Sequence, residues 1–167
     1  MRPLSGFRLR RFLTVTEREQ IAAALATAGR HTRARIGLSI DERAAKDPQA
    51  RARLLFQEWQ LPTDERPSAV LVYVSAPSRT YAIVGGDEVE RVAPQAFWEL
   101  LDRDLHHHFE EGRYCDGIFK AIAQVAIQLE RHFPRPPEEI QENSGGCPTD
   151  PEDARGNDRG DGTTSEE

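Results

Sequence analysis

The feature that most constrains the fold is a run of six apolar residues at positions 69–74, which reads Ala-Val-Leu-Val-Tyr-Val. A strand with one face in water alternates apolar and polar residues, and this run does not alternate. The run therefore predicts a strand that is covered on both faces. Because helices commonly cover both faces of such a sheet, the run favours an α/β fold.

Two further strands are predicted beside this run. Residues 35–40 alternate between apolar and polar side chains, as in a strand with one apolar face. Residues 81–84 follow a short turn, so they are predicted to form a hairpin with the central run. A right-handed crossover places the first two strands in parallel, and the hairpin makes the small sheet mixed.

Helical patterns surround the strand at residues 35–40. Thr16 and Glu19 have the spacing of a capping box, which predicts the start of the first helix, and Gly29 is predicted to end it. Asp47 and Pro48 predict the start of the second helix, as an N-cap followed by a first-turn proline.

Two longer helical stripes follow the third strand. The third helix is predicted to begin near Asp87 and to end at Gly112, and Asp116 opens the fourth. The stripes are Phe97, Leu101, Leu105 and Phe109, then Ile118, Ala121, Ile122, Val125 and Leu129. The order helix-strand-helix-strand-strand-helix-helix predicts an α/β fold. It is a single-domain, three-layer α/β/α sandwich with a small mixed sheet, at residues 12–133.

Charge divides the chain into three parts. Residues 1–11 form a short basic arm, and residues 134–167 form an acidic tail. The tail holds ten acidic and three basic side chains, a net charge of −7 against −6 for the whole chain, so residues 1–133 carry about +1. Because the tail has almost no large apolar residue, we expect it to be disordered. The near-neutral domain gives no electrostatic reason to expect nucleic-acid or membrane binding.

The cysteines and the N-terminus indicate the compartment. Cys115 lies in the predicted domain and Cys147 in the tail, so two free thiols in a reducing compartment are favoured over a disulfide. No apolar run follows the N-terminal arginines, so neither a signal peptide nor a transmembrane segment is expected. We expect a cytoplasmic monomer with an unidentified protein partner.

A series of short motifs carries a family resemblance. In chain order they include Tyr81-Ala82-Ile83-Val84-Gly85, Phe97-Trp98-Glu99, Gly112-Arg113-Tyr114, Asp116-Gly117-Ile118 and His132-Phe133-Pro134. In this order and spacing the chain resembles the TPM-domain family, in particular its soluble bacterial branch without a membrane anchor. The resemblance covers about residues 12–134.

The resemblance implies the same α/β/α fold. Some members of this family are described as acid phosphatases, and some bind calcium or other divalent cations. The chain departs from the family pattern in two places. After the third strand many relatives keep glycines and a Leu-Glu-Gly element, whereas residues 85–91 of this chain read Gly-Gly-Asp-Glu-Val-Glu-Arg. Leu13 and Thr14 stand where many relatives have an early aspartate. Both departures weaken the implied cation site.

One candidate site for Ca²⁺ or Mg²⁺ follows from the predicted topology. Asp41 ends the first strand and Asp116 opens the fourth helix, so both are predicted at one edge of the sheet with Glu42 nearby. Carboxylate oxygens are the ligands that these cations prefer. The alternative is structural: Asp116 charges the start of its own helix, and Asp41 belongs to a surface loop.

A second acidic group is predicted at the opposite edge. Asp87 and Glu88 follow two glycines, and flexible backbone beside carboxylates can hold a hard cation. The alternative is that these carboxylates form ion pairs with nearby arginines. The arginines placed at this edge are Arg33, Arg35, Arg66 and Arg91.

Other reactive residues do not form a catalytic set. His106, His107 and His108 are adjacent, so on a helix they point about 100° apart and cannot converge on one ion. Two surface histidines and one partly buried histidine are favoured instead. Cys115 lies near a helix start that can stabilise a thiolate, but a packed, inert thiol is favoured.

The functional expectation is an accessory or interaction module that can also bind a divalent cation. The alternative is a weak, cation-dependent acid phosphatase that acts on phosphomonoesters. The sequence leaves open whether the protein is an enzyme, because no nucleophile is paired with a base and an oxyanion site.

Overall fold

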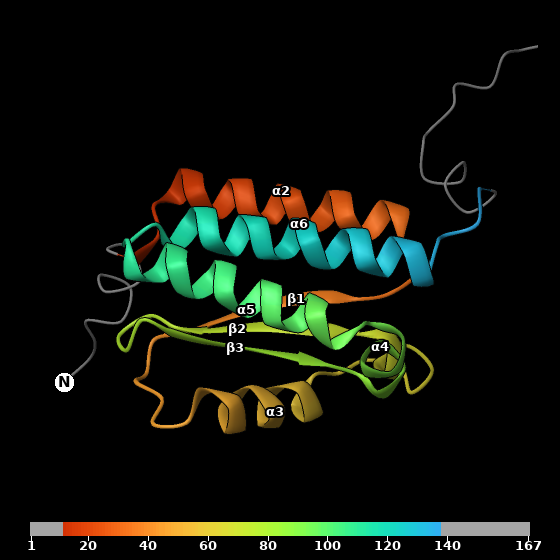
Figure 1. Cartoon of the computed structure of the whole chain (residues 1–167), viewed down its shortest axis with the longest axis horizontal. Helices are drawn as coiled ribbons and strands as arrows, with labels where there is room; N and C mark the ends of the chain where they lie inside the picture. The colour runs from red at the N-terminus through yellow and green to blue at the C-terminus, as the bar shows by residue number, and fades with distance from the viewer. Residues whose placement is uncertain (1–11, 138–167) are drawn as a thin grey trace, which may run out of the picture.

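The computed structural model describes residues 12–137 (Figure 1). The predicted arm at residues 1–11 and residues 138–167 of the predicted tail lie outside the described residues. The described strands are β1 (Ile36–Asp41), β2 (Val70–Ser75) and β3 (Thr80–Gly85). The described α-helices are α2 (Val15–His31), α3 (Pro48–Glu58), α4 (Asp87–Val92), α5 (Gln95–Glu110) and α6 (Tyr114–His132).

The elements form three layers, as the sequence predicts. The sheet has the order β1-β2-β3, with β1 and β2 parallel and β2 and β3 antiparallel. Helix α3 covers one face, and α2, α5 and α6 cover the other (Figure 1). None of the helices in residues 12–137 is long and apolar enough to cross a membrane.

The central strand lies between two apolar clusters of unequal size. Every residue of β2 is buried, which confirms the prediction from the apolar run. Val70 and Val74 pack with α2, α5 and α6, whereas Leu71 and Tyr73 pack with Ala52 and Phe56 of α3. The alternation of side chains along β2 therefore joins two separate cores.

The first helix begins two residues earlier than the sequence predicts. Thr14, not Thr16, is the N-cap, because its side chain accepts a hydrogen bond from Glu17 N and the Glu17 carboxylate accepts one from Thr14 N. The earlier cap lets Leu13 be buried. The predicted end at Gly29 is also wrong, because α2 continues to His31. Gly29 does not have a positive φ, and the helix continues through it.

Two helices replace the single third helix that was predicted to begin near Asp87. A short helix, α4, ends at Val92, and α5 begins at Gln95 after Pro94. Proline has no amide hydrogen and fits the start of a helix better than its interior. The turn at Ala93 and Pro94 lets α5 cross back over the sheet. The predicted end at Gly112 is confirmed, with φ +71°.

Gly86 lies at a tight corner between the sheet and α4. Its amide donates to the carbonyl of Ala69 at 2.8 Å. A Cβ atom at Gly86 would lie 2.3 Å from the carbonyl oxygen of Arg66 and 2.4 Å from that of Pro67. The guanidinium of Arg66 in turn donates to the last carbonyls of α3, including Phe56 O at 2.7 Å and Trp59 O at 2.8 Å. This corner therefore joins α3, β3 and α4.

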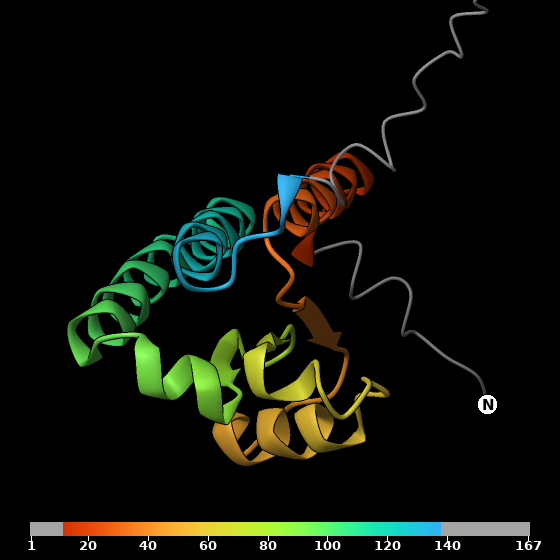
Figure 2. The same ribbon diagram turned by 90° about the vertical axis from the view of Figure 1, so that its right-hand side faces the viewer.

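A second junction joins the ends of α2 and α6. The buried hydroxyl of Thr32 lies 2.6 Å from the carbonyl oxygen of Phe133 and accepts from Ala34 N at 3.1 Å. The chain after α6 returns along the end of α2 (Figure 2), where Arg135 N donates to His31 O at 3.1 Å. The last described residues are therefore held against the first helix.

Candidate functional site

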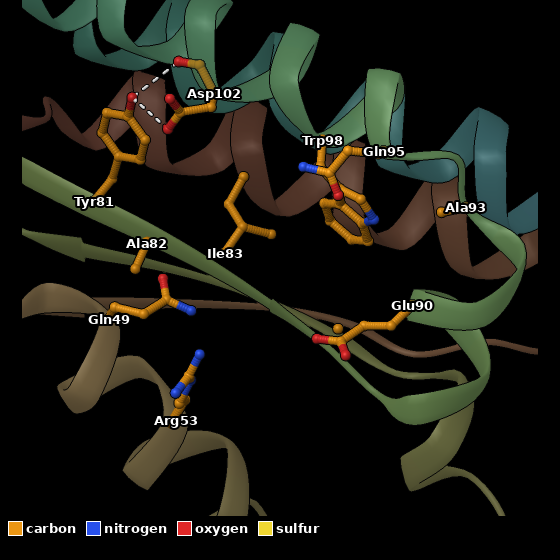
Figure 3. Close-up of a pocket in the computed structure, with 11 residues that line it drawn as sticks. Gln49, Arg53, Tyr81, Ala82, Ile83, Glu90, Ala93, Gln95, Trp98 and Asp102 are labelled. Atoms are coloured by element: carbon orange, nitrogen blue, oxygen red, sulfur yellow. Dashed lines mark hydrogen bonds between the residues drawn. The ribbon is translucent and has the colours of Figure 1, made fainter.

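A groove runs along β3, which is one of the two edge strands of the sheet. Its volume is about 710 Å³, and it lies between α3 and α5 with α4 at one end (Figure 3). Side chains from four elements meet there. The lining residues are Gln49 and Arg53 of α3, Tyr81, Ala82, Ile83 and Gly85 of β3, Glu90 of α4, Ala93, and Gln95, Trp98 and Asp102 of α5.

Aromatic and apolar side chains lie on the α5 side of the groove, together with the polar Gln95 and Asp102. Pro94 starts α5 so that Trp98 lies in its first turn, and the indole covers Gly85. A Cβ atom at Gly85 would lie 3.3 Å from the indole Cη2 atom. Tyr81 and Ile83 point to the same face of the sheet and pack against the larger core.

Tyr81 is a fixed hydrogen-bond donor in this groove. Its phenol donates to Asp102, 2.9 Å from the main-chain oxygen and 3.1 Å from Oδ1 (Figure 3). Burial and the negative charge of Asp102 both raise the pKa of Tyr81. The phenol therefore stays protonated at neutral pH, so it orients α5 on β3 and does not act as a base.

Arg53 and Glu90 supply opposite charges at the groove. Both side chains belong to exposed residues, and neither takes part in any ion pair between residues 12–137. Figure 3 shows Arg53 on the α3 side and Glu90 near α4. Both charges are thus available to a bound molecule.

Apolar, amide and charged side chains line the groove. Among the described residues that line it, none is a serine, threonine, cysteine or histidine. Ser75, which is buried, lies outside it and donates to Arg43 O at 2.8 Å. Cys115 lies in another groove, between α2 and α6, where burial and the charges of Glu17 and Asp116 raise the pKa of its thiol. A raised thiol pKa is consistent with the prediction that Cys115 is a packed, inert thiol.

The structure places Asp41 and Asp116 at one end of the domain but on opposite faces of the sheet. Asp41 is the last residue of β1, not part of a loop, and its carboxylate accepts from Arg51 Nε and from the Tyr73 hydroxyl, both at 3.2 Å. Asp116 lies in the first turn of α6 and lines the groove beside α2. The sequence places residues along a strand correctly but leaves open which face each side chain joins.

Asp87 and Glu88 form the first turn of α4, where carboxylates favour the positive end of the helix. The predicted ion pairs with arginines are not formed among the described residues. Arg35 instead pairs with Glu65 at 2.6 Å, and Arg66 binds main-chain carbonyls of α3.

The three adjacent histidines behave as predicted. His106 and His107 are exposed and pair with Glu110 and Glu111 one turn later, at 3.1 and 3.4 Å. His108 is half-buried, and its Nδ1 lies 2.7 Å from the carbonyl oxygen of Asp104. They project in different directions and share no ligand position.

A family model for the TPM domain matches residues 8–128, well over half of the chain. The chain belongs to the TPM domain family. The match confirms the resemblance inferred from the motifs, and it spans the sheet, the groove and most of α6. No curated protein matches this TPM domain.

Solved structures share the fold. The BA42 protein of the psychrophilic bacterium Bizionia argentinensis superposes with a TM-score of 0.68 at 24% identity, covering 76% of this chain and 88% of that one. The N-terminal domain of a P. gingivalis protein gives 0.57 at 18% identity, covering 73% and 79%. The N-terminal domain of the cg2496 protein of Corynebacterium glutamicum gives 0.54 at 13%, covering 70% and 74%. At these identities the likeness establishes the fold.

The positions of the described carboxylates bear on the two predicted cation sites. In the part of the chain that the structure describes, no three His, Cys, Asp or Glu side chains are close enough to hold a metal ion. The Asp41 carboxylate already accepts hydrogen bonds from Arg51 and Tyr73. Burial by itself raises the pKa of Asp41. Hydrogen bonds from the Arg43 amide, Arg51 and Tyr73 outweigh that effect and lower the pKa. The arrangement fits an ion pair with arginine better than Ca²⁺, which takes six to eight oxygens.

Cation binding at Asp41 and Asp116, or at Asp87 and Glu88, stays a prediction. If a cation binds, adding Ca²⁺ or Mg²⁺ to the whole chain should produce saturable amide NMR shifts around at least one of these pairs. A potassium titration at equal ionic strength is the control, because screening alone moves exposed carboxylates. Equal shifts with potassium, or none at either pair, would end the cation hypothesis.

Proposed function

We propose that this TPM domain is an accessory module that binds a segment of a partner protein in the groove along β3. The observation that carries the proposal is the composition of the groove. It combines half-buried aromatic side chains with free charges of both signs, and its described lining has no serine, threonine, cysteine or histidine. Aromatic residues and arginine are the side chains that most often provide binding energy in protein interfaces.

The near-neutral charge of the domain favours recognition by a local site and not by a broad charged surface. Residues 1–133 carry about +1, so long-range attraction does not select a strongly charged partner. Specificity would come from contacts within the groove, where Arg53 and Glu90 are in reach of different parts of a ligand.

A random-peptide library displayed against the whole chain tests the proposal, with Arg53→Glu as the groove variant. Peptides selected on the native protein are expected to bind Arg53→Glu at least about tenfold more weakly, a loss of about 1.4 kcal/mol. Calorimetry measures the affinities. The matched control is Arg131→Glu, because Arg131 is also exposed on a helix but does not line this groove.

Two outcomes would contradict the module. One is a library that yields no binder, and the other is equal weakening by Arg53→Glu and Arg131→Glu. Turnover of a generic phosphomonoester that needs an added divalent cation would favour the phosphatase alternative instead.

A further inference from the structure

We infer that the groove binds its partner as an added β-strand, paired with β3 along its open edge. The inference rests on the proposed function and specifies the kind of ligand: a short extended peptide with alternating apolar and acidic side chains. It follows from the free backbone groups of β3 and from the two different walls of the groove.

The register of the hairpin shows which backbone groups are free. Gly86 N donates to Ala69 O, and the same register pairs Val84 with Leu71 and Ala82 with Tyr73. In an antiparallel pair, hydrogen-bonded and non-hydrogen-bonded residues alternate. Ala82 and Val84 therefore direct their N–H and C=O groups toward β2.

The residues between them direct these groups away from β2. Tyr81, Ile83 and Gly85 form the non-hydrogen-bonded pairs with β2. Within residues 12–137, no turn, loop or cap hydrogen bond is made by the backbone N–H or C=O of these three residues. They leave alternating donors and acceptors along an edge strand, which is the template used in strand addition.

The walls of the groove favour an extended segment. Helices α3 and α5 lie on opposite faces of the sheet, so both flank the edge of β3 without crossing it (Figure 3). A strand added at the usual spacing of about 4.8 Å continues the sheet between them. Because the free groups run from Tyr81 to Gly85, about five residues of a partner would pair.

The two walls select different side chains. Tyr81 and Ile83 face the same side as Trp98, whereas Ala82 and Val84 face α3. Successive residues of the added strand alternate between these sides. Apolar side chains would pack on the aromatic wall, and acidic side chains between them would reach Arg53. Lysine at the acidic positions would meet the like charge of Arg53.

Synthetic peptides test strand addition without disturbing the fold of the domain. The probe is a capped heptapeptide of alternating valine and aspartate, and its counterpart replaces every aspartate with lysine. Amide NMR of the whole chain should show saturable shifts at Tyr81, Ile83 and Gly85. The aspartate peptide should bind at least about tenfold more tightly than the lysine peptide, and Arg53→Glu should reverse that order.

N-methylated versions of the aspartate peptide test the backbone pairing itself. In a strand, one alternate set of amides faces β3 and the other faces solvent. Methylating one set should weaken binding by about tenfold or more, whereas methylating the other should change it less than about twofold. Equal effects of both sets, with shifts still in the groove, would overturn strand addition while leaving the proposed function intact.

Self-association is the remaining alternative occupant of the edge. If the amides of Tyr81, Ile83 and Gly85 shift with protein concentration in the absence of peptide, a second copy pairs with β3 and the inference is wrong. If library-selected peptides bind the groove but neither probe does, the side-chain selection is wrong. Failure of every peptide in the library would instead remove the proposed function.

Discussion

Replacing Gly86 with alanine is expected to lower the free energy of unfolding by about 3 kcal/mol. The new Cβ atom would lie 2.3 Å from the carbonyl oxygen of Arg66 and 2.4 Å from that of Pro67. Both neighbours are backbone atoms of the short 3₁₀ helix that precedes β2, so no side chain can rotate to make room. Urea denaturation followed by circular dichroism measures the change.

Gly29→Ala is the matched control for this prediction. Gly29 is also a glycine of this domain, but it lies within α2 and a Cβ atom there would have no neighbour within 4 Å. Alanine should therefore stabilise the helix by about 0.5–1 kcal/mol. If both substitutions stabilise the domain, the corner at Gly86 is looser than the structure indicates.

Replacing Thr32 with valine is expected to lower the free energy of unfolding by about 2 kcal/mol. Valine keeps most of the shape of threonine, but it cannot donate to Phe133 O or accept from Ala34 N. The buried amide of Ala34 would lose its acceptor, and an unsatisfied buried donor costs about 1–3 kcal/mol. Thermal and urea unfolding of the whole chain give the measurement.

The control for the hydroxyl is Thr27→Val. Thr27 is an exposed residue of α2, the helix that Thr32 follows, so its loss of a hydroxyl should change stability by less than about 0.5 kcal/mol. Equal losses in the two variants would mean that a general effect of replacing threonine with valine, and not the buried hydrogen bonds of Thr32, determines the change in stability.

Most of the fold could be predicted because its signals are local. The run at residues 69–74 is apolar on both faces, and the Asp47 cap, which accepts from Ala50 N at 3.0 Å, is visible in the sequence. Errors arose where two local signals compete. Thr14 and Thr16 each have a glutamate three residues later, and only the burial of Leu13 decides between them.

The groove could not be predicted in the same way. Its residues come from α3, β3, α4 and α5, and their meeting depends on the turn at Pro94 and on the corner at Gly86. One signal was available. Trp98 is a large aromatic residue at the start of the apolar face of α5, and it is only partly buried where it packs on the larger core. The opposite faces of Asp41 and Asp116 likewise depend on tertiary packing, which strand order alone does not fix.

The two tryptophans of the chain lie at opposite edges of the sheet. Trp59 packs on Gly37 of β1, where an added Cβ would lie 2.7 Å from the indole, and Trp98 packs on Gly85 of β3. Each indole therefore senses a different edge. With Trp59→Phe, the emission spectrum would come from the groove alone, and with Trp98→Phe it would come from the far edge. The protein thus carries its own fluorescent probe and its own reference.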